Sequence, residues 1–184
     1  MPRLPVHSVE TAPEESREAL KALEARTGKV LNIYGEMAAS PAVLNAYAAM
    51  KQAIVDHSNL DATTRQAIAL AVANVDGCEY CQAAHTVAGR AAGLDDDLML
   101  EIRRGELTSD PRLAALVDVV REAAERMGEV GNATWEAARS AGWSDRELAD
   151  AFASIVANLF TNYFNHYVGT DLDLPAAPAL DPSS

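Results

Sequence analysis

The chain has 184 residues, enough for one domain whose core needs no disulfide framework. Its 27 acidic and 15 basic residues give a formal net charge of −12, and an acidic surface repels nucleic acid and anionic membranes. Residues 1–7 are punctuated by proline and lack the apolar run of a signal peptide, and no apolar stretch approaches the ~20 residues of a membrane span. We therefore expect a cytoplasmic protein without nucleic-acid or membrane partners.

The composition predicts an all-α fold. Alanine is abundant, with leucine, glutamate and arginine behind it, whereas long runs of valine, isoleucine and threonine are absent. Residues of the first group favour helices and those of the second favour strands. We expect a single helical domain over residues 1–184, with a core at about 40–170 and extended tails at 1–12 and 170–184.

Caps, prolines and glycines divide the chain into predicted helices. Apolar residues at three- and four-residue spacing support these helices. One of them, which follows a cap at Ser58 or Asp61, is apolar on nearly every side through residues 67–73, so we expect it to be the buried central helix. The predicted helices cover 13 to about 28, 30–37, 41 to about 55, about 62–75, about 78–92, 95–105, 111 to about 127, 132–142 and 144 to about 168.

One pattern occurs twice. Residues 88–95 and 137–144 each end a helix at glycine, add one apolar residue, and then cap a new helix. This similarity predicts a duplicated helical hairpin, although the chemistry of helix ends alone would generate much of it. Only the first copy contains cysteine, so we place the chemistry there.

The two cysteines of the chain, Cys78 and Cys81, stand three residues apart at a predicted helix start, and His85 follows one turn later. The spacing puts all three side chains on one helical stripe. Helix amides and a nearby imidazole both stabilise a thiolate, and two thiols this close can form a disulfide. One cysteine can then attack an oxidant while the other resolves the resulting sulfenic acid.

Other functions for this pattern are weaker. A structural zinc site needs four ligands, and the other histidines (His7, His57 and His166) lie far away in the sequence. Haem attachment needs histidine directly after the second cysteine, where the chain has Gln82, and a thioredoxin-type site needs alternating strands and helices. Two inert buried cysteines remain as an alternative. We therefore predict no metal and no cofactor other than a redox-active Cys78–Cys81 disulfide.

At this point the sequence resembles the AhpD-like alkylhydroperoxidases of the carboxymuconolactone decarboxylase family, in their peroxidase-related subgroup. The resemblance rests mainly on residues 65–85, which read RQAIALAVANVDGCEYCQAAH, and it spans roughly residues 40–175. Support comes from the Ala-Gly-Leu helix end at 92–94 and from NYFNH at 162–166 with TDLDLP at 170–175.

The resemblance implies an all-helical homo-oligomer, a trimer or hexamer with a dimer possible, that reduces hydroperoxides through its cysteine pair. By that resemblance Cys81, partnered with His85, would be the peroxidatic nucleophile and Cys78 the resolving thiol. A dithiol protein or a small thiol would then return the pair to its reduced state.

Two positions near the cysteines bear on this chemistry. The family usually has a relay glutamate twelve residues before the first cysteine, where this chain has Gln66. A neutral amide can orient a water or a thiol but cannot accept a proton. Tyr80 stands where some members carry a second histidine, and its phenol either donates a hydrogen bond or serves in packing.

Three functions are therefore compatible with the sequence. The first is a thiol-dependent peroxidase, with Cys81, Cys78, His85, Gln66 and Tyr80 as its site residues. The second is a lactone-acid decarboxylase, whose activity would not depend on the cysteine pair. The third is a binding protein whose disulfide switches assembly or partner contact.

Overall fold

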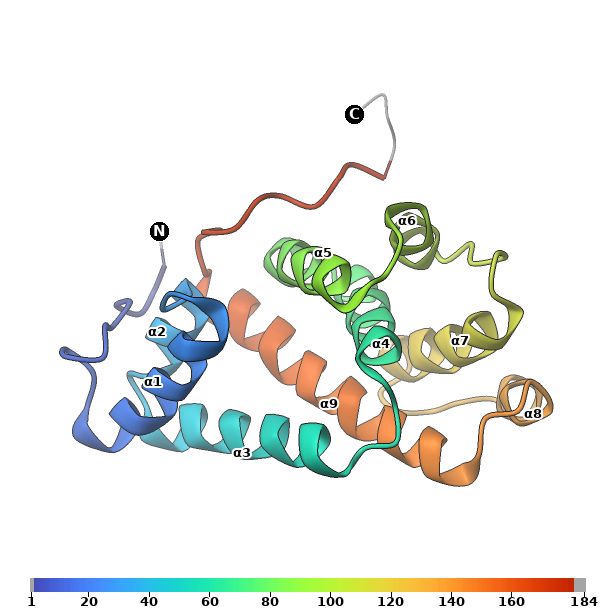
Figure 1. The fold of residues 1–184 in the computed structure, drawn as a ribbon, viewed down its shortest axis with the longest axis horizontal. Coiled ribbons are helices and arrows are strands. Elements are labelled where there is room, and N and C mark those ends of the chain that lie inside the picture. Colours follow the sequence, from blue (N-terminus) through green and yellow to red (C-terminus); the bar gives the residue numbers. More distant parts are fainter. Residues whose placement is uncertain (1, 181–184) are drawn as a thin grey trace.

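The computed structural model describes residues 2–180, and in that part of the chain it has nine α-helices and no strand (Figure 1). This confirms the predicted all-α fold. Met1 and residues 181–184, which include the end of the predicted C-terminal tail, lie outside the described residues. The helices are α1 Glu14–Thr27, α2 Asn32–Met37, α3 Pro41–His57, α4 Ala62–Val75, α5 Glu79–Ala92, α6 Asp96–Arg104, α7 Pro111–Glu125, α8 Asn132–Ser140 and α9 Asp145–Val168.

Helix α4 is the central helix, as its apolar sequence predicts. Every residue from 67 to 73 is buried. The helix packs against α5, α7 and α9, and the long α9 crosses the middle of the molecule to reach α3 as well (Figure 1). Because small alanines alternate with larger side chains along α4, several helices can approach its axis closely.

Most helix ends fall within a residue or two of the predicted positions, and the structure decides the uncertain ones. Asp61, not Ser58, caps α4 by accepting the Thr64 N–H at 2.7 Å. Helix α8 begins at Asn132, as predicted, and Gly131 before it is the N-cap. A side chain can cap a helix only where the backbone before it is extended, and the tertiary fold sets that backbone.

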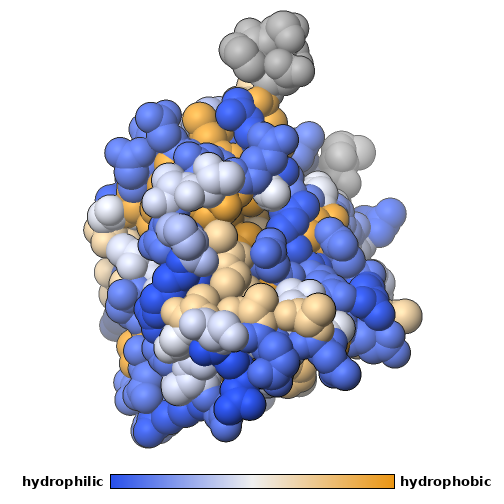
Figure 2. All heavy atoms as spheres, turned by 90° about the vertical axis from the view of Figure 1, so that its right-hand side faces the viewer, coloured by the Kyte–Doolittle hydropathy of each residue, from blue (hydrophilic) through white to orange (hydrophobic). Residues whose placement is uncertain are grey.

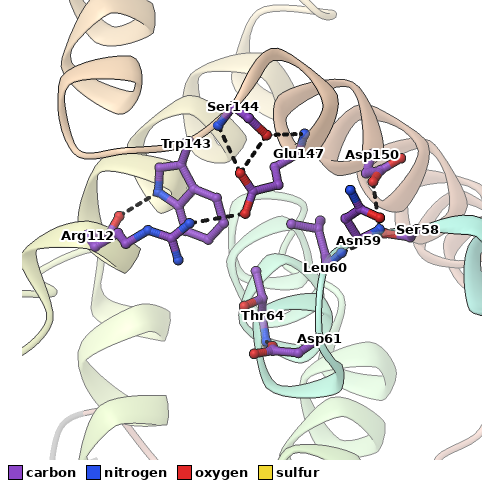
Figure 3. A network of polar contacts seen from close by, with 10 residues as sticks. All are labelled: Ser58, Asn59, Leu60, Asp61, Thr64, Arg112, Trp143, Ser144, Glu147 and Asp150. Carbon is purple, nitrogen blue, oxygen red and sulfur yellow. Dashed lines mark hydrogen bonds and ion pairs between the residues drawn. The ribbon is translucent and has the colours of Figure 1, made fainter.

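The start of α9 is fixed by a polar network that reaches α7 (Figure 3). Ser144 and Glu147 form a capping box, in which each side chain accepts the other residue's backbone N–H. Glu147 also pairs with Arg112 at 3.1 Å, and the Trp143 indole N–H donates to the Arg112 carbonyl at 2.7 Å. The guanidinium of Arg112 lies 3.6 Å from the Trp143 ring centroid. These contacts set the direction in which α9 leaves the turn.

The repeated pattern of the sequence adopts the same local geometry in both places. Gly93 and Gly142 have positive φ angles of 99° and 94°, which glycine adopts without strain. The apolar residue after each, Leu94 and Trp143, is buried. The pattern therefore ends one helix and begins the next in both copies, while duplication of a whole hairpin stays a prediction.

The buried residues form two clusters. The larger one gathers side chains of α4, α6, α7 and α9. The smaller one gathers side chains of α1, α2 and α3 and includes both cysteines. Residues that belong to the second cluster therefore surround the predicted redox site.

After α9, residues 170–180 cross over α5 towards α6, and we call this segment the C-terminal strap (Figure 1). Its first residue, Thr170, donates from its hydroxyl to the buried Glu36 at 2.5 Å. Towards its other end, the Pro178 carbonyl accepts from Arg103 of α6 at 2.7 Å. The strap is thus held at both ends.

The outer face of the molecule agrees with the acidic composition. The side that carries α7 and α8 is largely hydrophilic, with apolar side chains scattered between the polar ones (Figure 2). Among the described helices, none combines the length and the apolar character that crossing a bilayer requires.

The buried centre of α4 makes a stability prediction. Leu70→Ala removes a side chain with no exposed surface, so we expect it to lower the free energy of unfolding by about 3 kcal/mol. Val55→Ala removes a side chain that is 47% exposed and should change that free energy by less than about 0.5 kcal/mol. Urea denaturation of both variants measures the difference, and equal losses would contradict a core centred on α4.

Candidate functional site

The site begins at the tight turn between α4 and α5. Asp76 ends α4, and Gly77 follows with a φ of 62°, in the left-handed region that favours glycine. The Cys78 N–H then donates back to the Ala73 carbonyl at 2.9 Å. This turn makes Cys78 the N-cap of α5 and leaves Cys81 inside the first turn of that helix.

Helix α9 holds this turn from the other side. The Asn162 amide donates to the Asp76 carboxylate at 2.8 Å, and His166 Nε2 donates to the Asp76 carbonyl at 3.0 Å. Asn162 is completely buried. Asn162 and His166 therefore position Asp76 and the turn that precedes Cys78.

Both cysteines are buried, and both are free thiols. The Cys81 N–H donates to Cys78 Sγ at 3.4 Å. The Asn165 amide reaches both sulfurs, at 3.2 Å from Cys81 Sγ and 3.7 Å from Cys78 Sγ. Thr161 Oγ1 lies 4.0 Å from Cys81 Sγ. The Asn165 amide of α9 is thus a donor to both thiols, whereas the Cys81 N–H of α5 donates to Cys78 alone.

These contacts make the two thiols unequal. Hydrogen bonds from the Cys81 side chain, the Cys81 N–H and the Asn165 amide lower the pKa of Cys78 to about 7, against the effect of burial. Its hydrogen bond to Cys78, together with burial, raises the pKa of Cys81. A thiolate at Cys78 also sits at the positive end of the α5 dipole. One thiolate next to one thiol is therefore the favoured form of the pair near neutral pH.

His85 lies one turn beyond Cys81 and is paired with Gln66. The distance between His85 Nδ1 and Gln66 Oε1 is 2.8 Å. Since the amide oxygen accepts, Nδ1 carries the proton in this pair. Burial, with a smaller effect from the charge of Lys51, lowers the pKa of His85 to about 3. The structure brings Gln66 and His85 together as a neutral pair, and among residues 2–180 neither thiol is hydrogen-bonded to His85.

Tyr80 lies between the cysteines in sequence, but its phenol is directed to the C-terminal strap. The hydroxyl donates to the Asp173 carboxylate at 2.7 Å, and Lys29 pairs with the same carboxylate at 3.0 Å. Burial and this carboxylate raise the pKa of Tyr80, so the phenol keeps its proton. Tyr80 therefore ties the strap to the cysteine turn, and a catalytic role for it stays a prediction.

Two cavities lie on either side of this site. One, of about 290 Å³, is lined by Cys78, Asn165 and His166 among others. The other, of about 460 Å³, is lined by His85 and Gln66 and is mostly apolar. Cys81 belongs to the lining of neither cavity as far as the described residues go. Small reactants can therefore approach the pair from the Cys78 side.

Sequence reasoning did not identify several residues of the site. Asn165 and Thr161 contact the sulfurs, Asp173 binds Tyr80, and Lys51 lines the same cavity as His85. The one available signal was the four-residue spacing of Thr161 and Asn165 on a helix, which places them on one face. Elsewhere, no group of three His, Cys, Asp or Glu side chains in residues 2–180 is arranged to hold a metal ion.

The model of the carboxymuconolactone decarboxylase family matches residues 41–125, which include α4, the cysteine turn and α5. Over these residues the chain is similar to the carboxymuconolactone decarboxylase family. The match confirms the resemblance drawn from residues 65–85. Among proteins of curated function, no match to the chain is found.

Solved structures extend the likeness to nearly the whole chain. A peroxidase-related protein with an alkylhydroperoxidase AhpD core from Ralstonia eutropha has a TM-score of 0.83 at 23% identity, covering 94% of this chain and 92% of the other. A peroxidase-related protein from Silicibacter sp. gives 0.80 at 23% identity, with coverages of 97% and 94%. The debrominase Bmp8, as a cysteine-to-alanine variant with 2,3,4-tribromopyrrole, gives 0.80 at 12% identity, with coverages of 93% and 91%. These likenesses establish the AhpD-core fold for this chain.

The unequal thiols make a prediction about alkylation. With Cys81→Ser, which keeps a hydroxyl donor, we expect iodoacetamide to alkylate Cys78 with a midpoint near pH 7. With Cys81→Ala, the largest of the stabilising hydrogen bonds is lost, so the midpoint should move up towards the ordinary thiol value of about 8.5. Alkylation rates measured by mass spectrometry across pH test this, and identical midpoints in the two variants would contradict it.

The bond between Tyr80 and the strap makes a second prediction. Tyr80→Phe removes the donor to Asp173, so we expect faster hydrogen exchange over residues 170–180. Tyr167→Phe is the matched control, because Tyr167 is 74% exposed. Hydrogen exchange monitored by mass spectrometry compares the two variants. Unchanged exchange in Tyr80→Phe would show that other contacts hold the strap.

Proposed function

We propose that this chain is a thiol-dependent hydroperoxide reductase whose Cys78 and Cys81 cycle between dithiol and disulfide. The observation that carries the proposal is the pair itself, with the Cys81 N–H 3.4 Å from Cys78 Sγ and one amide reaching both sulfurs. The match of residues 41–125 to the carboxymuconolactone decarboxylase family and a fold shared with peroxidase-related proteins support it.

The reaction proceeds in three balanced steps. A thiolate attacks the terminal peroxide oxygen, so that the O–O bond breaks and a sulfenic acid forms, while the leaving alkoxide takes a proton from water to become the alcohol. The second thiol attacks the sulfenic sulfur, and water leaves as the disulfide forms. A dithiol reductant then returns two electrons and two protons to the pair by thiol–disulfide exchange.

The contacts in this chain favour Cys78 as the attacking thiolate. It is the helix cap, it accepts hydrogen bonds that stabilise negative charge, and it lines the smaller cavity. Cys81 keeps its proton and is in the described lining of neither cavity, as expected for a thiol that resolves the sulfenic acid. The resemblance implies the opposite order of roles, so the order needs a direct measurement.

In this proposal His85 and Gln66 shape the site as a neutral pair. With a pKa of about 3, His85 holds no charge near neutral pH. Gln66 fixes the ring through its amide oxygen, where the family usually has a glutamate. Asn165 then supplies the hydrogen bonds that stabilise negative charge on sulfur.

Thiol mass spectrometry after substoichiometric cumene hydroperoxide tests the proposal. We expect the unmodified protein to form the Cys78–Cys81 disulfide. With Cys81→Ser, a sulfenic acid on Cys78 should be trapped by dimedone, whereas Cys78→Ser should give much less trapped adduct. Both variants should lose nearly all peroxide-dependent oxidation of a dithiol, because the resolving step needs both sulfurs.

Three outcomes would count against parts of this proposal. Turnover equal to that of the unmodified protein in both single variants would overturn the dithiol mechanism. Faster trapping on Cys81 than on Cys78 would restore the roles that the resemblance implies. Absence of any disulfide after peroxide treatment would overturn the reductase function itself.

A further inference from the structure

The larger cavity, of about 460 Å³, is bounded by α1, α3, α4, α5 and the C-terminal strap. Its volume lies in the range of small-molecule sites, which is about 300–1,000 Å³. Most of its wall is aliphatic or aromatic, including Tyr34, Tyr47 and Val87. A ligand that fills it would therefore have an apolar body.

The charges in the cavity wall are opposite in sign to the rest of the protein. The chain has 27 acidic and 15 basic residues, yet the described lining contains three cations (Arg26, Lys29 and Lys51) and neither aspartate nor glutamate. Lys29 is paired with Asp173 at 3.0 Å, and Arg26 donates to the neutral Gln52 at 2.5 Å. Positive charge thus remains inside an otherwise acidic molecule.

Lys51 is the third cation of the cavity wall. It is half-buried, and within residues 2–180 its ammonium group takes part in no ion pair or hydrogen bond. Burial and the nearby charges of Arg65 and Arg26 lower the pKa of Lys51. An ammonium group in this position is stabilised by an anion that enters the cavity, because such an anion replaces the lost water and opposes the neighbouring cations.

We propose that the cavity binds a carboxylate ion with an alkyl or aryl body, with its charge held by Lys51 and Arg26. Neither cysteine is in the described lining of this cavity, so the ligand is an apolar carboxylic acid held beside the redox site and not the peroxide that Cys78 reduces; the inference therefore goes beyond the proposed function. The apolar body of the ligand lies against α5, where His85 lines the cavity and Cys81 stands one turn towards the N-terminus.

The bound charge also has a consequence for His85. The charge of Lys51 is one of the causes that lower the pKa of His85. A carboxylate on Lys51 offsets that effect, so binding moves the imidazole towards the protonated form. His85 therefore reports on occupation of this cavity in a way that a distant surface site would not.

Isothermal titration of the reduced protein with octanoate and with octanol tests the inference without any peroxide. We expect octanoate to bind and Lys51→Gln to weaken that binding at least about tenfold, because a charged hydrogen bond is lost. Octanol binding should be unchanged by this substitution. Lys21→Gln is the matched control, since Lys21 is exposed on α1 outside the cavity. Arg26→Gln is a second variant in case Lys51→Gln folds poorly.

Nuclear magnetic resonance of His85 places the ligand. Octanoate should shift the His85 ring signals in the unmodified protein and in Lys21→Gln, and less in Lys51→Gln. The inference is overturned if octanoate does not bind, if it binds Lys51→Gln and Arg26→Gln as tightly as the unmodified protein, or if it leaves His85 unchanged.

The two proposals fail separately. Octanoate binding without any peroxide-driven disulfide would support the carboxylate site and overturn only the reductase function. A disulfide formed with cumene hydroperoxide, together with no octanoate binding, would overturn only the carboxylate site.

Discussion

The turn between α4 and α5 is the constraint on which the site depends. Gly77 adopts a left-handed backbone, the Cys78 N–H returns to Ala73, and α9 fixes Asp76 through Asn162. Were this turn to relax, Cys78 would no longer cap α5 and its sulfur would lose the Cys81 N–H. Because α4 is buried on all sides, the turn has a rigid support.

The same packing gives the two thiols different pKa values. Cys78 collects donors at a helix N-terminus, while Cys81 is enclosed by apolar side chains and by its neighbour. Burial also keeps His85 neutral, so the imidazole does not contribute a charge to the pair. The polar group that stabilises charge on sulfur is instead the amide of Asn165. A neutral donor serves this purpose without the desolvation cost of a second ion.

The C-terminal strap joins the redox site to the larger cavity. Asp173 binds both Tyr80, between the cysteines, and Lys29, in the cavity wall. Leu174 of the strap lines the same cavity. A displacement of the strap would therefore change contacts both at Tyr80 and in the wall of the larger cavity. The strap thus links the residues beside the thiols to the wall of the larger cavity.

The sequence by itself determined what depends on neighbouring residues. Local spacing and hydrogen bonding account for the helix starts at Asp95 and Ser144, for the buried residues 67–73, and for the stripe of Cys78, Cys81 and His85. Only the tertiary structure decided the rest. Asn165 meets Cys81 across 84 residues of sequence, and Asp173 meets Tyr80 across 93. The charge of Lys51 affects the pKa of His85 because α3 and α5 border one cavity, which both side chains line. Helix packing brings together residues that are this far apart in the sequence, and no local sequence pattern indicates such contacts. The pKa of each thiol and the charge of the cavity wall could therefore not be predicted.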